Sequence, residues 1–287
     1  MRLLAVADLH YNNARSRRLA DELIDQLHHA GGDAVVLVGD TSVADGPWLE
    51  ACLDRIRFPL RLFVCGNHEL WTAGENSYRL FRHELPRRVR EAGWHWLEDE
   101  PLVLGSLAIV GTIGWYDYSF AAQHLGIPRR FYQAKVSPGV AAAREELAYL
   151  RPEADDVSDA ARRIFARWND GRFVKLGRSD EAFLDELLGR LGGQLASLSA
   201  MKHIVAAVHH VPFAELLPPA RFSQWDFAWA FLGSGRIGRT FSGFPNVRHV
   251  VCGHSHWPAE ATIGPIRAIN IGSGYRWKTF ASLDLPG

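Results

Sequence analysis

The chain has 287 residues, of which 47% are hydrophobic, enough to form the core of one large folded domain. Its 32 Lys and Arg residues balance its 32 Asp and Glu residues, which argues against a protein that coats DNA or lies on a membrane surface. Its three cysteines are too few and too scattered for a disulfide scaffold. We expect a cytoplasmic protein, because no apolar run approaches the roughly 20 residues of a membrane-spanning helix and no secretory signal is visible.

The first part of the chain alternates apolar runs with helical patterns. Buried strands are predicted over residues 2–7, 33–38 and 61–65. Helices are predicted over residues 13–30, 47–56 and 75–92. This order is typical of an α/β fold, in which parallel strands are joined by right-handed crossovers.

The pattern changes after Trp94. Residues 94–114 contain short β-like pieces that predict a second sheet. Residues 115–178 have only patchy helical periodicity, and we interpret them as an insertion or cap within a single domain of residues 1–287.

The last part of the chain returns to regular patterns. A helix that begins at Ser179 has a capping signal and leads into a strand over residues 203–208. Residues 222–244, rich in aromatic residues, Gly and Arg, are expected to form a long loop over the site. Closing strands are predicted over residues 248–252, 266–271 and 280–285.

Polar side chains follow five predicted strands at the point where each strand ends. They are Asp8 and His10, Asp40, Asn67 and His68, His209 and His210, and His254 and His256. Strand ends are where open sheets carry their ligand sites. One such residue alone is more often a cap or turn residue, but five motifs together favour a site. We expect Asp8 and His10 to alternate along an extended segment, as do His254 and His256, so that both side chains of a pair point the same way.

The residue types indicate a metal centre. Carboxylate oxygens and imidazole nitrogens suit Mn, Fe or Zn, and the absence of a cysteine cluster argues against a thiolate zinc site. The candidate ligands are Asp8, His10, Asp40, Asn67, one of His209 and His210, His254 and His256. They are too many for one tetrahedral ion but suit two ions about 3.5–4 Å apart with one bridging carboxylate. Such a pair supplies a bridging hydroxide and neutralises phosphate oxygens, and the sequence shows neither a nucleophile elbow nor a Walker loop.

The ordered motifs Asp-x-His, Gly-Asp, Gly-Asn-His-Glu, a strand-end His and Gly-His-x-His resemble the calcineurin-like metallophosphoesterases. The resemblance implies a four-layer α/β/β/α sandwich of two sheets flanked by helices. It also implies that His68 lies above the metals, contacts the phosphate and protonates the leaving group. By resemblance, Asp8, His10, Asp40 and His256 hold one metal, and Asp40, Asn67, the strand-end His and His254 hold the other, with Asp40 as the bridge.

Two patterns of that superfamily are missing. Phosphoprotein phosphatases place an Asp-Arg pair shortly after Gly-Asp, whereas residues 41–44 here read Thr-Ser-Val-Ala. Purple acid phosphatases place a Tyr ligand in the same region, and this sequence has none. Both subgroups are therefore disfavoured.

Alternatives stay open for several residues. His209 follows its strand directly and is the favoured ligand, whereas His210 has the His-x-Pro spacing of some family members and otherwise faces substrate or core. Glu69 is expected to anchor its loop, and Asp45 either orients His68 or serves a turn.

Arginines and aromatic residues provide further candidates for contacts with substrate. Arg236 and Arg239, with Arg129 and Arg130, are candidates to bind phosphate or a second anionic group. Substrate stacking and core packing are alternatives for Trp71, Trp115, Tyr116 and Trp225, with packing favoured for each.

The favoured function is a binuclear-metal-dependent phosphodiesterase that uses a metal-bridging hydroxide. Mn is the expected metal, and Fe, Zn or Ni are alternatives, because the same O and N donors accept all of them. A phosphomonoesterase, a nuclease acting on DNA or RNA ends and a non-catalytic scaffold are the alternative functions. The expected partner is a small phosphate ester, with nucleic acid as the alternative and no membrane, and the sequence says nothing of oligomeric state.

Overall fold

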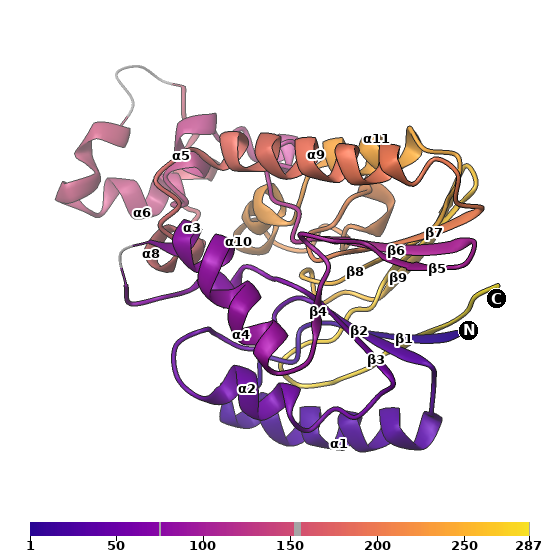
Figure 1. Cartoon of the computed structure of the whole chain (residues 1–287). Coiled ribbons are helices and arrows are strands. Elements are labelled where there is room, and N and C mark those ends of the chain that lie inside the picture. The colour runs from indigo at the N-terminus through magenta and orange to yellow at the C-terminus, as the bar shows by residue number, and fades with distance from the viewer. Residues whose placement is uncertain (75, 152–155, 287) are drawn as a thin grey trace.

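The computed structural model describes residues 1–74, 76–151 and 156–286. Two sheets lie face to face, and helices cover both outer faces (Figure 1). The strands are β1 (Arg2–Val6), β2 (Ala34–Val38), β3 (Leu60–Val64), β4 (His95–Trp96), β5 (Leu102–Leu104), β6 (Leu107–Thr112), β7 (His203–Val208), β8 (Val247–Cys252), β9 (Ala259–Ile263), β10 (Ile266–Asn270) and β11 (Ala281–Asp284). The predicted four-layer α/β/β/α sandwich of two sheets and flanking helices is confirmed.

The first sheet has the order β11-β1-β2-β3-β4 and the second the order β5-β6-β7-β8-β10-β9. Strands β1 to β4 run parallel, and β11 pairs antiparallel with β1. In the second sheet β6, β7, β8 and β10 run parallel, and β5 and β9 pair antiparallel at the two edges. The carboxyl ends of the parallel strands in each sheet therefore meet at one edge, where ligand sites form.

The helices connect these strands. The α-helices are α1 (Ala14–Ala30), α2 (Trp48–Leu53), α3 (Ser77–Arg79), α4 (Leu85–Glu91), α5 (Arg129–Gln133), α6 (Pro138–Ala142), α7 (Asp159–Arg162), α8 (Asp170–Phe173), α9 (Asp180–Ser197), α10 (Ser223–Asp226) and α11 (Gly235–Ser242). The 3-10 segments are η1 (His68–Leu70), η3 (Gln123–Leu125), η4 (Glu145–Leu150), η5 (Ala214–Leu216) and η6 (Phe227–Phe231). In Figure 1, α1 and α2 cover the first sheet and α9 and α11 the second.

A π-helical segment, η2 (Leu80–Glu84), joins α3 to α4 within the helix predicted over residues 75–92. The Leu85 N–H donates to the carbonyl of Leu80, and Pro86 follows in the first turn of α4. Because Pro lacks an N–H and its ring clashes with the carbonyl four residues earlier, a wider turn accommodates it without ending the helix.

Strand alternation divides the core into two layers. Leu3 and Ala5 of β1 belong to the apolar layer between the two sheets. Leu4 and Val6 face the other way and pack in the same cluster as Leu23 of α1. This period of two is the reason that uninterrupted apolar runs form strands buried on both faces.

Three expectations about the fold need correction. Strand β4, predicted within a second sheet, pairs with β3 in the first, and β9 was not predicted. Residues 222–244 are not a long loop but form α10, η6 and α11. Residues 115–178, predicted to be irregular, contain short helices and 3-10 segments, and several of these form a small apolar cluster around Phe131.

Candidate metal centre

The candidate ligands lie in turns directly after β1, β2, β3, β7 and β8. Left-handed backbone occurs at Asp8 (φ 57), His10 (φ 46), Asp40 (φ 54), His254 (φ 67) and His256 (φ 53). The expectation of extended Asp-x-His and His-x-His segments is therefore wrong, and turns rather than strand alternation aim these side chains. Such backbone costs about 1–3 kcal/mol per non-glycine residue and clusters at functional sites.

Glycines precede the ligand residues because the turns pack too closely for a side chain. A Cβ at Gly39, Gly66 or Gly253 would overlap His209, Asp40 or Asp8, respectively. The glycines of the three Gly-containing motifs are thus required by the approach of one ligand turn to another.

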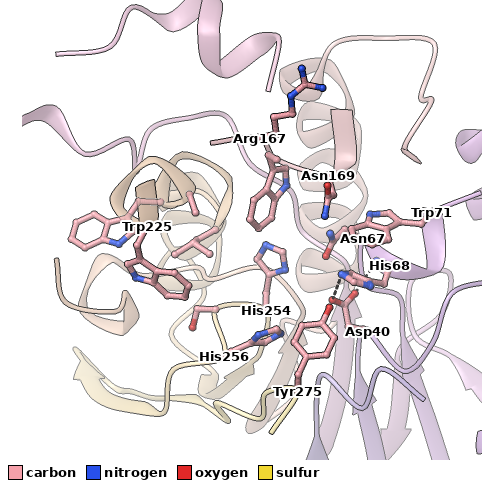
Figure 2. A pocket seen from close by; sticks show the side chains of 15 residues that line it. Asp40, Asn67, His68, Trp71, Arg167, Asn169, Trp225, His254, His256 and Tyr275 are labelled. Carbon is pink, nitrogen blue, oxygen red and sulfur yellow. Dashed lines mark hydrogen bonds and ion pairs between the residues drawn. The ribbon is translucent and has the colours of Figure 1, made fainter. Parts of the chain in front are cut away.

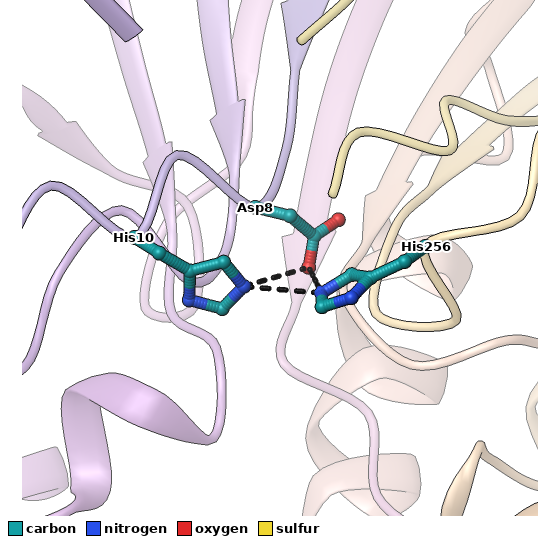
Figure 3. A group of neighbouring side chains, drawn as sticks. All are labelled: Asp8, His10 and His256. Carbon is teal, nitrogen blue, oxygen red and sulfur yellow. Dashed lines mark hydrogen bonds and ion pairs between the residues drawn. The ribbon is translucent and has the colours of Figure 1, made fainter. Parts of the chain in front are cut away.

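The first ligand group consists of Asp8, His10 and His256, which converge on one point (Figure 3). The His10 Nε2 lies 3.0 Å from the His256 Nε2, and the His256 Nε2 lies 3.4 Å from the Asp8 Oδ1. Asp8 and His10 are buried, whereas His256 keeps 24% of its side chain exposed. The Asp8 carboxylate also accepts the backbone N–H of His254, which ties this group to the turn of the second.

The second group consists of Asp40, Asn67, His209 and His254, all buried. The His209 Nε2 lies 3.0 Å from the His254 Nδ1, 3.2 Å from the Asn67 Oδ1 and 3.3 Å from the Asp40 Oδ1. The structure therefore brings His209 rather than His210 against Asp40.

Asp40 lies between the two groups. Its Oδ1 faces His209, and its Oδ2 lies 3.9 Å from the His10 Nε2 of the first group. One oxygen is thus available to each group, which is the arrangement that a bridging carboxylate needs.

Hydrogen bonds assign the histidine nitrogens that face the centre. His209 bonds through Nδ1 to the Val38 carbonyl at 2.9 Å, which leaves Nε2 for the cluster. Burial acts to lower the pKa of His209, but the Asp40 carboxylate outweighs it and raises the pKa to about 9. Burial holds the pKa values of His10 and His254 well below their usual range, so both are neutral imidazoles, the form that binds metal.

His210 lies next to the second group without joining it. Its Nδ1 bonds to the Ile113 carbonyl at 2.9 Å, and its ring centroid lies 4.3 Å from that of His254. Burial lowers the pKa of His210 to about 3, so it packs as a neutral ring. It does not line the cavity described below, where the sequence analysis considered a contact with substrate.

His68 lies over the two groups. Its Nε2 is 3.7 Å from the Asp40 Oδ2, and its ring stacks on Trp71 with the centroids 3.6 Å apart. Its backbone N–H donates to the Asp40 Oδ1. The ring is thus held between Asp40 and Trp71 and lines the cavity described below.

Glu69 accepts the backbone N–H groups of Asp40, Ser42 and Gly66 at 3.0, 3.0 and 2.6 Å. It joins the turn after β2 to the turn after β3, in agreement with the expectation that it anchors its loop. Asp45 does not touch His68 but accepts hydrogen bonds from Thr72 and Ala73.

A cavity of about 220 Å³ opens onto this centre. It is lined by Asp40, Asn67, His68, Trp71, Arg167, Trp168, Asn169, Trp225, Ala228, Trp229, Leu232, His254, Ser255, His256 and Tyr275. Figure 2 shows aromatic rings on several sides of it. Trp71 and Trp225 therefore face the cavity, whereas Trp115 and Tyr116 are fully buried in the core.

The arginines expected near the substrate lie elsewhere. Arg236 pairs with Asp185, and both Arg236 and Arg239 line a separate surface hollow beside α9. Arg129 pairs with Glu181, and Arg130 pairs with Asp156. The interpretation of residues 222–244 as a loop over the site placed Arg236 and Arg239 wrongly, since α11 carries them to the outer face of the second sheet.

Two residues of the site were not predicted. Asp170 accepts a hydrogen bond from the Asn67 Nδ2 at 2.8 Å, and Tyr275 stacks on His10 with ring centroids 4.3 Å apart. Asp170 lies in an Asn-Asp-Gly run that is typical of an exposed turn, and no strand precedes it. Nothing local in the sequence distinguished it.

The donor set fits two divalent metals. Two carboxylates and five imidazoles, including that of His68, form overlapping groups of three, and within each group the ligand atoms lie within 4.8 Å of one another. Carboxylate oxygens and imidazole nitrogens gathered in a buried site favour a cation between them, and this mixture of O and N donors suits Mn, Fe or Zn. No helix in the described part of the chain has the length and apolarity needed to cross a membrane.

Comparison with known proteins gives a family match. The family model described as calcineurin-like phosphoesterase matches residues 1–258. No curated protein matches the sequence. A solved structure described as phosphopantetheinyl hydrolase from Mycobacterium tuberculosis superposes with a TM-score of 0.68 at 22% identity, covering 97% of this chain and 95% of that one. A dimetal phosphatase from Danio rerio superposes with a TM-score of 0.52 at 13% identity, covering 98% and 91%.

Proposed function

The chain belongs to the calcineurin-like phosphoesterase family, a family of metal-dependent phosphoester hydrolases, and we propose that it is a phosphodiesterase that works with two divalent metal ions. The observation that carries the proposal is the pair of ligand groups on either side of Asp40, with His68 over them. Asp8, His10, Asp40 and His256 would hold one ion, and Asp40, Asn67, His209 and His254 the other.

Two ions in these groups would supply an activated water and neutralise the phosphate oxygens. The chain's own residues do the rest. Asn67 and the two carboxylates would provide oxygen ligands for the ions, and a protonated His68 imidazole would give its proton to the leaving oxygen. Burial lowers the pKa of His68, which makes its protonated form a stronger acid, and a bound phosphate anion beside it favours that protonated form.

The charge of the cavity supports a diester over a monoester. A monoester at neutral pH carries about two negative charges, which phosphatases balance with cationic side chains. Among the described residues that line the cavity, Arg167 is the one Lys or Arg, and in Figure 2 its guanidinium points away from the ligands. A diester carries one negative charge and needs less neutralisation.

The substituents of the diester would lie against aromatic surface. Trp168 and Asn169 come from residues 115–178, which we propose are an insertion that forms one wall of the cavity and selects the substrate. Trp225 lies across the cavity from Asn169 (Figure 2), and Trp229 also lines the cavity. Phosphopantetheinyl esters are one substrate class to test, because one structural neighbour is described as a phosphopantetheinyl hydrolase. Mn²⁺ is the metal to load first.

The test compares hydrolysis of bis-p-nitrophenyl phosphate and p-nitrophenyl phosphate in Mn²⁺ by wild type, Asp40→Ala and Asp45→Ala. Asp40→Ala removes the ligand between the two groups, whereas Asp45 lies in the same loop and, among the residues that the structure describes, bonds only to Thr72 and Ala73. We expect faster wild-type turnover of the diester, loss of activity in Asp40→Ala and retention in Asp45→Ala. Preference for the monoester would reassign the protein as a phosphatase, and equal activity of wild type and Asp40→Ala would overturn the metal mechanism.

A further inference from the structure

Asp170, at the start of α8, is a buried carboxylate that receives four donors. Its side chain is fully buried. The donors are the Asn67 Nδ2 at 2.8 Å and the Trp71 Nε1 at 2.6 Å on Oδ1, and the Tyr116 OH at 3.1 Å and the Trp168 Nε1 at 2.7 Å on Oδ2. Each oxygen thus accepts two hydrogen bonds, which nearly exhausts its lone pairs.

No ion pair found among residues 1–74, 76–151 and 156–286 includes Asp170. A buried carboxylate without a paired cation is costly unless hydrogen bonds hold its charge. The Trp71 and Trp168 indole N–H groups can only donate, so each carboxylate oxygen of Asp170 acts as an acceptor.

This fixes the orientation of the Asn67 amide. The Asp170 Oδ1, which already accepts from the Trp71 indole, also accepts from the Asn67 NH₂ group, so the Asn67 Oδ1 faces the other way. The Oδ1 then lies 3.2 Å from the His209 Nε2, among the ligand atoms of the second group. A flipped amide would set its NH₂ group against the metal and its oxygen against a carboxylate.

The two indoles that donate to Asp170 pack against other residues of the centre. Trp71 carries the stacked ring of His68. Trp168 lies edge-on to His254, with ring centroids 5.6 Å apart. One carboxylate therefore has contacts, direct or through one ring, with Asn67, His68 and His254.

We propose that Asp170 is a positioning residue that fixes the Asn67 oxygen, and through Trp71 the His68 ring, before any metal binds. The inference rests on the two-metal site of the proposed function. It means that residues 115–178 do more than line the cavity, because one of them prepares a ligand of the second metal.

The main experiment measures Mn²⁺ binding to wild type, Asp170→Asn and Asp180→Asn by isothermal titration and equilibrium dialysis. Asp180 is the control, since it is also buried and accepts from the Trp115 Nε1 and the Tyr118 OH, whereas it pairs in addition with Lys135 and has no hydrogen bond or ion pair with a candidate ligand in the described part of the chain. We expect Asp170→Asn to lower the affinity for one of the two Mn²⁺ ions by about 10–100-fold, the usual effect of losing a residue that orients a ligand. The affinity for the other ion should stay unchanged. Asp180→Asn should bind both ions as wild type does.

A second measurement needs no variant. In metal-free wild type, NMR should show one set of slowly exchanging signals for the Asn67 side-chain amide and for the Trp71 and Trp168 indole N–H groups. An Asn67 amide that averages between two orientations until metal is added would overturn the proposal, as would unchanged binding in Asp170→Asn or equal loss in Asp180→Asn. If wild type bound no divalent ion while the Asn67 amide stayed fixed, the proposed function would fail and the positioning role would survive.

Discussion

The ligand turns and residues 115–178 both contribute to the same cavity, but they hold their side chains in different ways. In the ligand turns the backbone does the work: Asp8, Asp40 and His254 have left-handed backbone, and backbone hydrogen bonds such as Asp8 N–H to the Gly39 carbonyl join one turn to the next. In residues 115–178 a side-chain carboxylate, Asp170, holds aromatic and amide groups. A change of backbone conformation in a turn moves every ligand that the turn carries, whereas a hydrogen-bond network can lose one member and keep the others. We therefore expect changes in the ligand turns to have large effects on metal binding and activity, and changes in residues 115–178 to have graded ones.

Gly66→Ala should produce the largest effect. The added Cβ would overlap the Asp40 carboxylate and its backbone, so the turn must move and both ions lose the shared ligand. We expect a loss of bound Mn²⁺ and a fall in diesterase activity of at least about 100-fold, since small misplacements of reacting groups cost that much.

The control for this change is Gly126→Ala in residues 115–178. Gly126 also has a left-handed backbone, with φ 57, but nothing lies near its added Cβ. It should cost only about 1–2 kcal/mol of stability in a denaturant titration and leave activity unchanged. Equal effects of the two alanines on activity would remove the contrast between the regions.

His68→Ala should slow turnover without emptying the centre. His68 lies over Asp40 and is not among the ligands, so its loss removes proton donation, which contributes about 10²–10⁴-fold. The measurement is kcat together with Mn²⁺ content after dialysis. Metal loss as large as that of Asp40→Ala would show that His68 has been misassigned.

Removal of metal should separate the regions in hydrogen exchange. Metal binding offsets the strain of the left-handed turns, so a chelator should speed amide exchange at residues 8–10 and 254–256 while α5 and α6 exchange as before. The melting temperature should fall as well, because an ion at 100 times its Kd stabilises a fold by about 2.7 kcal/mol. Uniform acceleration across the chain would mean that metal supports the whole fold rather than the turns.

Arg236→Ala should have the smallest effect. Its partner Asp185 is exposed, and such surface pairs contribute about 0–1 kcal/mol. Diesterase activity should stay within about twofold of wild type, because the side chain lies in a hollow separate from the cavity. A large rise in KM would restore the sequence-based interpretation that Arg236 binds substrate.

The same contrast explains what could be predicted from the sequence. The ligand turns follow buried strands and need glycine at fixed places, so Gly39 with Asp40 and Gly253 with His254 form short local motifs. The fold class followed from the alternation of apolar runs and helices. Asp170 could not be found in this way, because its partners Asn67 and Tyr116 are 103 and 54 residues away and no spacing records such contacts.

The left-handed turns themselves were not predicted, because a segment of Asp, Leu and His shows no preference for that conformation over an extended one. Tertiary contacts decide it: the His10 N–H donates to the Asp40 carbonyl and the Gly253 N–H to the His209 carbonyl. The prediction for Arg236 was wrong for a related reason: the aromatic residues and glycines of residues 222–244 obscure the helical periodicity of α11, which carries Arg236.

Strand β1 pairs with β11, and His10 meets His256, so the first ligand group joins residues 246 positions apart. Contacts of such high sequence separation form late, because the loop-closure entropy must be overcome first. During synthesis β1 therefore keeps one edge unpaired, a surface prone to aggregation, until residues 281–284 have been made. The first ligand group is complete only after His256 has come against His10, so the protein can bind metal there only once this contact has formed. The metal content of the purified protein therefore also measures the fraction of molecules that have completed folding.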